Sequence, residues 1–247
     1  MKKIVIIILA FFILVSGCIN EGNEIKSKKI SPELAEFAAK EYLPKYYSGD
    51  YEVLGRIKMY DLGGEVTAYA FIFKKSGFKV NNLEEMKSLV EETEGIPEKY
   101  FTRETATVVV SAVNTISPLH RTYTGLPGIF VLEKDIEDFI REEYPEYNKG
   151  RIIFLNPFDI VYEASKQSDI DKKPLSSDSL LISTGKIDEP RKVSDLRHDL
   201  EERERREEKQ LAQMNKETRR EFLEMQRNKI QANIDKWNEF EERFQLR

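Results

Sequence analysis

The C-terminal end of the chain constrains the fold most. Residues 191–247 contain neither glycine nor proline, and acidic and basic side chains recur three or four positions apart. This spacing places opposite charges on neighbouring helical turns and is typical of a solvated helix. Ser194 is a suitable N-cap. At 1.5 Å per residue, one continuous helix of this length would extend about 80 Å, well beyond the diameter of a small domain. The sequence therefore predicts one long charged helix over 191–247.

Apolar residues form a stripe along this predicted helix. Ile230, Trp237 and Phe244 are spaced by seven, which favours coiled-coil packing of the distal half. Such packing would make the chain a homo-oligomer, and the alternative is that the helix folds back on the body or reaches a partner. The whole stripe consists of Leu211, Met214, Phe222, Met225, Ile230, Ile234, Trp237, Phe240 and Phe244.

The N-terminus has the pattern of an export signal. Two lysines at positions 2 and 3 precede an apolar run over residues 4–15. The run has the length of the hydrophobic region of a signal peptide and is short for a membrane-spanning helix. The small residues Ser16 and Gly17 follow it, and then comes Cys18, the one cysteine in the chain.

The stretch Val15-Ser16-Gly17-Cys18 resembles the lipobox of prokaryotic, archaeal-type lipoproteins. The resemblance implies removal of residues 1–17, lipidation of Cys18, and a lipid anchor on the extracytoplasmic face of the cell membrane. The alternative is an uncleaved N-terminal membrane anchor. Residues 18–30 are polar and without periodicity, so they are expected to form a flexible tether. With one cysteine, an intrachain disulfide is excluded.

Residues 31–190 form the predicted body, and its first unit spans 31–114. Ser31-Pro32-Glu33 opens a helix, because serine caps, proline suits the first turn and glutamate favours the positive end of the helix. Two β-rich runs around Gly63-Gly64 predict a hairpin. A short helix over 82–93 and a buried strand over 105–113 follow, the latter because of its β-branched content.

A second unit, residues 130–190, repeats this order. A helix runs up to the residue before Pro145, two strand runs meet at Asn156-Pro157, and residues 179–187 form a further strand candidate. The two units share aromatic and proline positions at an offset of about one hundred residues, which suggests an internal duplication. The expected fold class is therefore α+β, with two helix-plus-antiparallel-hairpin units followed by a long C-terminal helix. The positions that match are Phe37, Tyr42, Pro44 and Tyr46 in the first unit and Phe139, Tyr144, Pro145 and Tyr147 in the second.

The body also resembles PepSY-type modules and the related streptopain pro-domain and inhibitor group. The matching features are the helix, Tyr-Pro, strand, turn, strand order, the hairpin over residues 60–73, and the ending Thr184-Gly185-Lys186-Ile187. The polar stretch 167–178 departs from the family pattern. The resemblance implies an α+β fold and a role in binding or restraining a peptidase, and it implies no catalytic residues.

The amino-acid composition argues against several classes of binding and catalytic site. The formal net charge is −5, so the chain has no overall basic surface for nucleic acid. One cysteine and two histidines leave little material for a zinc site or a Ser-His-Asp triad. The sequence contains no P-loop, GxGxxG, HExxH or EF-hand pattern. We therefore expect no cofactor, no metal and no enzymatic activity.

Residues 114–128 are the most distinctive predicted loop, rich in proline, glycine and threonine. His120, Arg121 and Tyr123 make it a candidate partner or ligand site, since such sites favour loops on rigid scaffolds. The alternative is a plain connector between the two units. The sequence thus predicts a non-catalytic, lipid-anchored module that binds an unidentified protein, with a peptidase as one class of partner. A ligand-binding or hydrolytic lipoprotein that uses 114–128 is the competing hypothesis.

Overall fold

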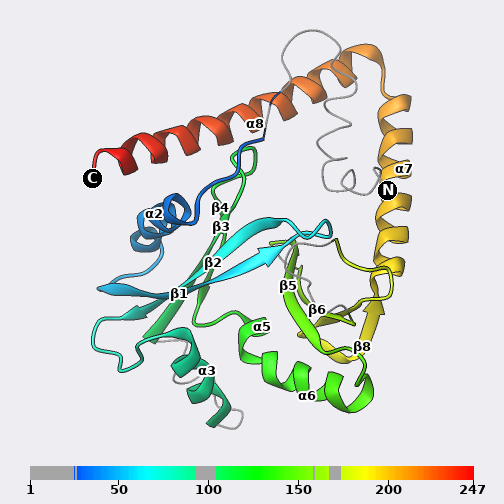
Figure 1. The fold of residues 1–247 in the computed structure, drawn as a ribbon. Helices are drawn as coiled ribbons and strands as arrows, with labels where there is room; N and C mark the ends of the chain where they lie inside the picture. Colours follow the sequence, from blue (N-terminus) through cyan, green and yellow to red (C-terminus); the bar gives the residue numbers. More distant parts are fainter. Residues whose placement is uncertain (1–24, 26, 93–103, 158, 167–173) are drawn as a thin grey trace.

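The computed structural model describes residues 25, 27–92, 104–157, 159–166 and 174–247. Within them, one mixed sheet has the strand order β4-β3-β2-β1-β5-β6-β7-β8 (Figure 1). Neighbouring strands are antiparallel except β1 and β5, which pair in parallel at Tyr60 and Ile153. The strands are β1 (Tyr51–Tyr60), β2 (Val66–Lys75), β3 (Thr105–Ser111), β4 (Leu119–Thr124), β5 (Lys149–Asn156), β6 (Asp159–Ser165), β7 (Leu180–Ser183) and β8 (Lys186–Lys192).

The helices begin where the local sequence favours them. The Ser31 hydroxyl accepts a hydrogen bond from the Leu34 amide at 3.2 Å, and Pro32 occupies the first turn, as predicted. The predicted helix over 82–93 is also confirmed. The helices are α2 (Pro32–Tyr42), the 3-10 turn η1 (Leu43–Lys45), α3 (Leu83–Glu92), α5 (Gly128–Val131), α6 (Glu133–Glu143), α7 (Val193–Gln213) and α8 (Lys216–Gln245).

Both faces of the sheet are covered, which follows from the two-residue period of a strand. On one face, Phe71 of β2 and Val108 of β3 pack against α2 and the end of α8. On the other face, Ala70 of β2 and Val109 of β3 pack against α5 and α6, and Ile72 packs against α3. The predicted hairpins around Gly63-Gly64 and Asn156-Pro157 are present as β1–β2 and β5–β6.

The prediction of two helix-plus-hairpin units is wrong, because all the strands join one continuous sheet. The pairing of β1 with β5 joins the two hairpins, and it removes the free edge that each hairpin would otherwise expose to solvent. The helices α2 and α6 lie against opposite faces of this shared sheet, so they do not repeat one arrangement on separate sheets.

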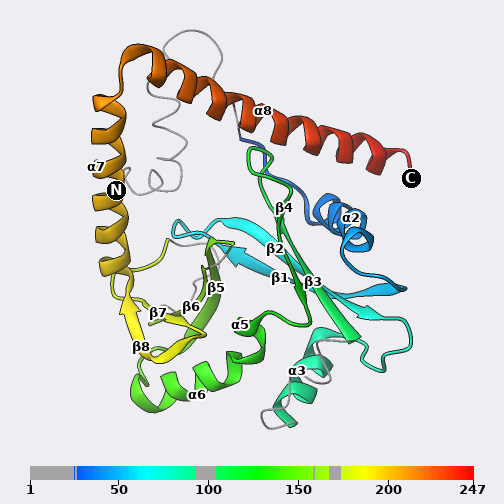
Figure 2. The ribbon, with the colours of Figure 1, turned by 180° about the vertical axis from the view of Figure 1, so that it is seen from behind.

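The prediction of a single C-terminal helix is also wrong. The helix α7 ends at Gln213, and Met214 and Asn215 are extended, with ψ angles of 141° and 160°. The Asn215 side chain accepts a hydrogen bond from the Thr218 amide at 2.9 Å and starts α8. Asparagine is among the strongest N-caps. By starting α8, Asn215 interrupts the helical run although no glycine or proline is present. Figure 2 shows the resulting angle between α7 and α8.

The predicted strand over 179–187 is a hairpin, with β7 and β8 joined at Thr184-Gly185. The strand β8 is the edge of the sheet and contains Pro190, which an edge tolerates because the missing N–H need not pair. At the other end of the body, residues 28–30 of the predicted tether lie beside residues 112–114. The Ile30 amide donates to the Ala112 carbonyl at 2.9 Å, and Ile30 is buried. This part of the tether is therefore integral to the body.

Candidate functional site

The predicted site residues of the 114–128 segment lie on β4 rather than in a loop. The Arg121 guanidinium donates to the Pro157 carbonyl at 3.0 Å and stacks over the Tyr123 ring, 4.6 Å from its centroid. These contacts tie β4 to the turn between β5 and β6. The structure thus brings Arg121 and Tyr123 together, and their contacts are internal to the fold.

His120 is a packing residue. Its ring centroid lies 4.7 Å from that of Phe154, and within the described residues its buried Nε2 has no hydrogen-bond partner. Burial lowers the pKa of His120 to about 4, since the apolar surroundings disfavour the charged imidazolium. The imidazole is therefore neutral over the physiological range.

Cys18 lies outside the described residues, so lipidation stays a prediction. The structure does describe residues 27–30, which follow Cys18 in the sequence. The Lys28 ammonium pairs with Glu241 of α8 at 2.9 Å, and the Lys28 amide donates to the Asn114 side chain at 2.7 Å. The chain therefore enters the fold beside the C-terminal end of α8.

A pocket of about 430 Å³ lies between α6 and the strands β5 and β6. This volume falls within the range of small-ligand sites in proteins. Glu133 and Glu137, one helical turn apart on α6, both line it, with Arg141 one turn further on. Gly150 and Tyr162 line it from the sheet.

Gly150 makes room for the Tyr162 hydroxyl in this pocket. A Cβ atom at position 150 would lie 1.7 Å from the Tyr162 Oη, so no other residue fits without displacing the ring. In this position the Tyr162 hydroxyl donates to Glu137 Oε1 at 3.1 Å. The pocket therefore has a fixed polar contact between the helix and the sheet.

Two acidic side chains, Glu133 and Glu137, line the pocket against one basic side chain, Arg141. Burial raises the pKa of Tyr162 well above its usual value, and the charges of Glu137 and Glu133 raise it further. Glu133 is partly neutralised, because it pairs with Lys87 of α3 at 2.5 Å. The Arg141 guanidinium donates to Asp138 at 2.7 Å, and its side chain is 72% exposed. Glu137 is therefore the carboxylate with the least compensation by a neighbouring cation.

The second candidate is the pair of helices α7 and α8, residues 193–245, which we call the arm. Figures 1 and 2 show that the arm joins the body near its two ends and that its middle stands away from the sheet. At its base, the Val193 amide donates to the Ser179 carbonyl at 2.9 Å, and Arg197 donates to the Leu175 carbonyl at 2.6 Å. Leu196 and Leu200 pack against the core below.

A buried ion pair lies in the sheet near this base. Arg151 of β5 and Glu163 of β6 are 2.5 Å apart, with 3% and 1% of their side chains exposed. The Tyr60 ring lies 5.3 Å from the Arg151 guanidinium carbon. Removing one partner from such a pair leaves an uncompensated charge in the interior. A single substitution at position 151 or 163 is therefore expected to destabilise the fold.

The far end of the arm docks on α2 through aromatic packing. Trp237 and Phe240 are buried, and Phe37 of α2 meets Phe240 at 6.2 Å and Phe244 at 5.6 Å between ring centroids. The Trp237 indole also donates to the Ile116 carbonyl at 3.3 Å. Two of the three heptad-spaced residues, Trp237 and Phe244, thus pack within their own chain.

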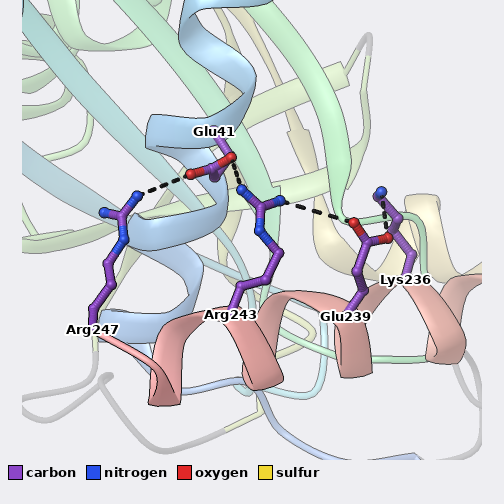
Figure 3. Close-up of polar contacts among 5 residues, drawn as sticks. All are labelled: Glu41, Lys236, Glu239, Arg243 and Arg247. Carbon is purple, nitrogen blue, oxygen red and sulfur yellow. Dashed lines mark hydrogen bonds and ion pairs between the residues drawn. The ribbon is translucent and has the colours of Figure 1, made fainter.

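Charged side chains also join α2 and the end of α8 (Figure 3). Glu41 of α2 accepts from Arg243, and from Arg247 at 3.2 Å. Glu239 pairs with Lys236 at 2.8 Å and approaches Arg243 at 3.9 Å. Exposed ion pairs contribute about 0–1 kcal/mol each, so the aromatic rings supply most of the docking energy.

The middle of the arm leaves apolar side chains at the surface. Met225 is 56% exposed, and Leu211, Met214, Phe222 and Leu223 are half-buried. Phe222, Leu223 and Met225 lie within four residues of each other on α8. Isolated apolar residues are common on protein surfaces, but such a group of large ones is typical of an interaction site. The predicted stripe is thus used for docking at its distal end and stays accessible in its middle.

Several residues of these sites were missed from the sequence. Glu133 and Glu137 have no local signal, because nothing in the nearby sequence shows that Tyr162 lies opposite them. Gly150 could have been noticed, since a glycine inside a strand often marks a close approach of another group. The Arg151–Glu163 pair has no local signal, because its partners lie on different strands.

Comparisons with known proteins add no assignment. No family model matches the chain, and no curated protein and no solved structure is significantly similar to it. Across the described residues, no group of three or more histidine, cysteine, aspartate or glutamate side chains could hold a metal ion. The helices that the structure describes are all too short or too polar to cross a membrane.

Proposed function

We propose that this protein is a lipid-anchored, extracytoplasmic and non-catalytic module that binds a protein partner through the middle of its arm. The observation that carries the proposal is the pair of half-buried Phe222 and exposed Met225 in the first half of α8, in the middle of the arm, which Figure 1 shows standing away from the sheet. A helix held in this way presents its face without needing to fold on binding, which lowers the cost of association.

The charge of α8 favours a protein over a lipid surface as the partner. It carries equal numbers of acidic and basic side chains. Helices that lie on membranes are rich in lysine and arginine on their polar face. An apolar cluster among balanced charges is better matched to another amphipathic helix. A peptidase is the partner class to test first, because of the sequence resemblance of the body.

The lipid anchor fits the place where the chain enters the fold. Nine peptide steps separate Cys18 from Ser27, which span at most about 30 Å. Ser27 lies beside Thr115, whose carbonyl accepts from Asn233 of α8 at 3.1 Å. A lipid on Cys18 would therefore keep the far end of the arm near the membrane surface.

Co-purification from native membranes tests the proposal. We would compare the unaltered protein with a Phe222→Glu/Met225→Glu variant, and use Arg227→Glu as the control. Position 227 is exposed on the same stretch of α8, about 200° around the helix from Met225, and the control makes the net charge more negative by the same amount as the double variant. We expect one partner with the unaltered protein and the control, and its loss with the double variant.

Retention of the same partner by the double variant would contradict binding through the arm. The absence of any partner and of self-association from all three preparations would contradict the proposed function itself. A partner that proves to be a second copy of the chain would assign the arm to oligomerisation.

A further inference from the structure

The pocket under α6 has an available carboxylate oxygen. Glu137 Oε1 accepts from the Tyr162 hydroxyl at 3.1 Å, while Oε2 takes no partner within the described part of the chain. Glu133 lies one turn away on the same helical face and adds negative charge to the pocket. Two nearby cations have other partners than Glu137, since Lys87 pairs with Glu133 and Arg141 donates to Asp138.

The walls of the pocket suit a planar or compact cation. Tyr147 and Tyr162 contribute aromatic surface, and aromatic faces attract cations with about 0.5–2 kcal/mol. The Tyr147 ring already accepts the ammonium group of Lys166, 4.5 Å from its centroid. Glu137 is exposed, so a cation can reach its carboxylate from solvent and form charge-assisted hydrogen bonds with it.

We propose that this pocket binds a guanidinium or ammonium group, which an arginine or lysine side chain of the protein partner inserts between α6 and the sheet. Glu137 accepts the hydrogen bonds of the cation, and Tyr162 holds Glu137 in place from the sheet. The assignment of the cation to a partner rests on the proposed function. A free organic cation has the same chemistry and is the other source to be distinguished.

Calorimetric titration of the full chain, purified in detergent, tests this proposal. The probes are a capped Ala-Arg-Ala peptide, a capped Ala-norleucine-Ala peptide of similar length, and agmatine, which carries a guanidinium group without a peptide. Glu137→Gln is the test variant. It keeps an acceptor for the Tyr162 hydroxyl and removes the charge, so the fold is retained. Glu142→Gln is the control, because Glu142 is exposed on the same helix and does not line the pocket.

We expect the arginine peptide to bind and the norleucine peptide not to bind. Glu137→Gln should weaken the arginine peptide by about tenfold or more, as expected for the loss of a charge-assisted contact. Glu142→Gln should leave the affinity within about twofold, because Glu142 does not line the pocket and salt and water screen its charge. A Tyr162→Phe variant should weaken binding less than Glu137→Gln, because it loosens the carboxylate without removing its charge.

The proposal is overturned if neither the arginine peptide nor agmatine binds, if the norleucine peptide binds equally well, or if Glu137→Gln has no effect. Tighter binding of the arginine peptide than of agmatine supports a partner side chain. The reverse order removes the partner as the source and keeps the cation site. Arm variants that lose the protein partner but still bind the arginine peptide would show that the arm and the pocket are separate sites. A failure of one proposal could then be told apart from a failure of the other.

Discussion

The burial of His120 predicts a specific loss of stability in mild acid. Its pKa is about 4 in the folded chain against 6.5 for the ordinary group, because burial against Phe154 disfavours the charged ring. The unfolded chain therefore binds a proton at this position between pH 6.5 and 4, while the folded chain does not. The free energy of unfolding falls as the pH falls through this window, and the contribution of His120 is fully present above it.

The magnitude follows from the two pKa values. Each pKa unit corresponds to about 1.4 kcal/mol, so the full effect is about 3 kcal/mol. Between pH 7.5 and pH 5, which covers part of the window, His120 should remove about 2 kcal/mol of the free energy of unfolding. A loss of this size is a large share of the stability of an ordinary domain.

Chemical denaturation at the two pH values measures this loss. The buried Trp237, the one tryptophan in the chain, is the fluorescence probe. Both His120→Phe and His120→Gln remove the titrating group, and only the first keeps an aromatic ring at this position. Because two variants are compared, a change of fold in one of them does not decide the result. Both variants should be less sensitive to pH than the unaltered protein by about 2 kcal/mol, since other titrating groups are shared. Equal pH sensitivity in all three proteins would show that His120 is not buried in its neutral form.

Three further predictions concern the arm, the sheet and the anchor. Trp237→Ala should cost about 3–5 kcal/mol of docking energy, and limited proteolysis within α8 should become faster; unchanged cleavage would contradict the docking of α8 on α2. Arg151→Met should cost about 3–5 kcal/mol in thermal denaturation, because it leaves Glu163 unpaired, while Arg151→Met/Glu163→Leu should recover most of it; equal loss in both would argue against a buried pair. Cys18→Ala should abolish lipid labelling and shift the protein out of the membrane fraction, and unchanged fractionation would contradict lipidation.

Local structure was predictable where the signal lies within a few residues. The Ser31 cap with Pro32, and the β1–β2 hairpin at Gly63-Gly64, follow from turn and capping chemistry. The break at Asn215 is also local, but a lone asparagine among charged helix formers is a weak signal without glycine or proline. The prediction of one long helix therefore failed at a residue whose side chain caps the next helix.

Long-range pairing was not predictable. The alternating pattern specifies which face of β1 and β5 is buried, but it does not specify which strand each pairs with. The pattern over Trp237 and Phe240 likewise specified an apolar face of α8 and left its partner, α2, open. The pocket was missed for the same reason, because Glu137 and Tyr162 meet only once α6 has packed on the sheet.

The central claim, that a protein partner binds the middle of the arm, is tested most directly by photo-crosslinking in native membranes. A photoreactive residue is placed at position 225, which is 56% exposed among the apolar residues, and for comparison at the exposed position 227, on the opposite side of the helix. We predict one adduct of defined mass from position 225 and none from position 227. Adducts of equal yield from both positions, or none from position 225, would contradict the claim.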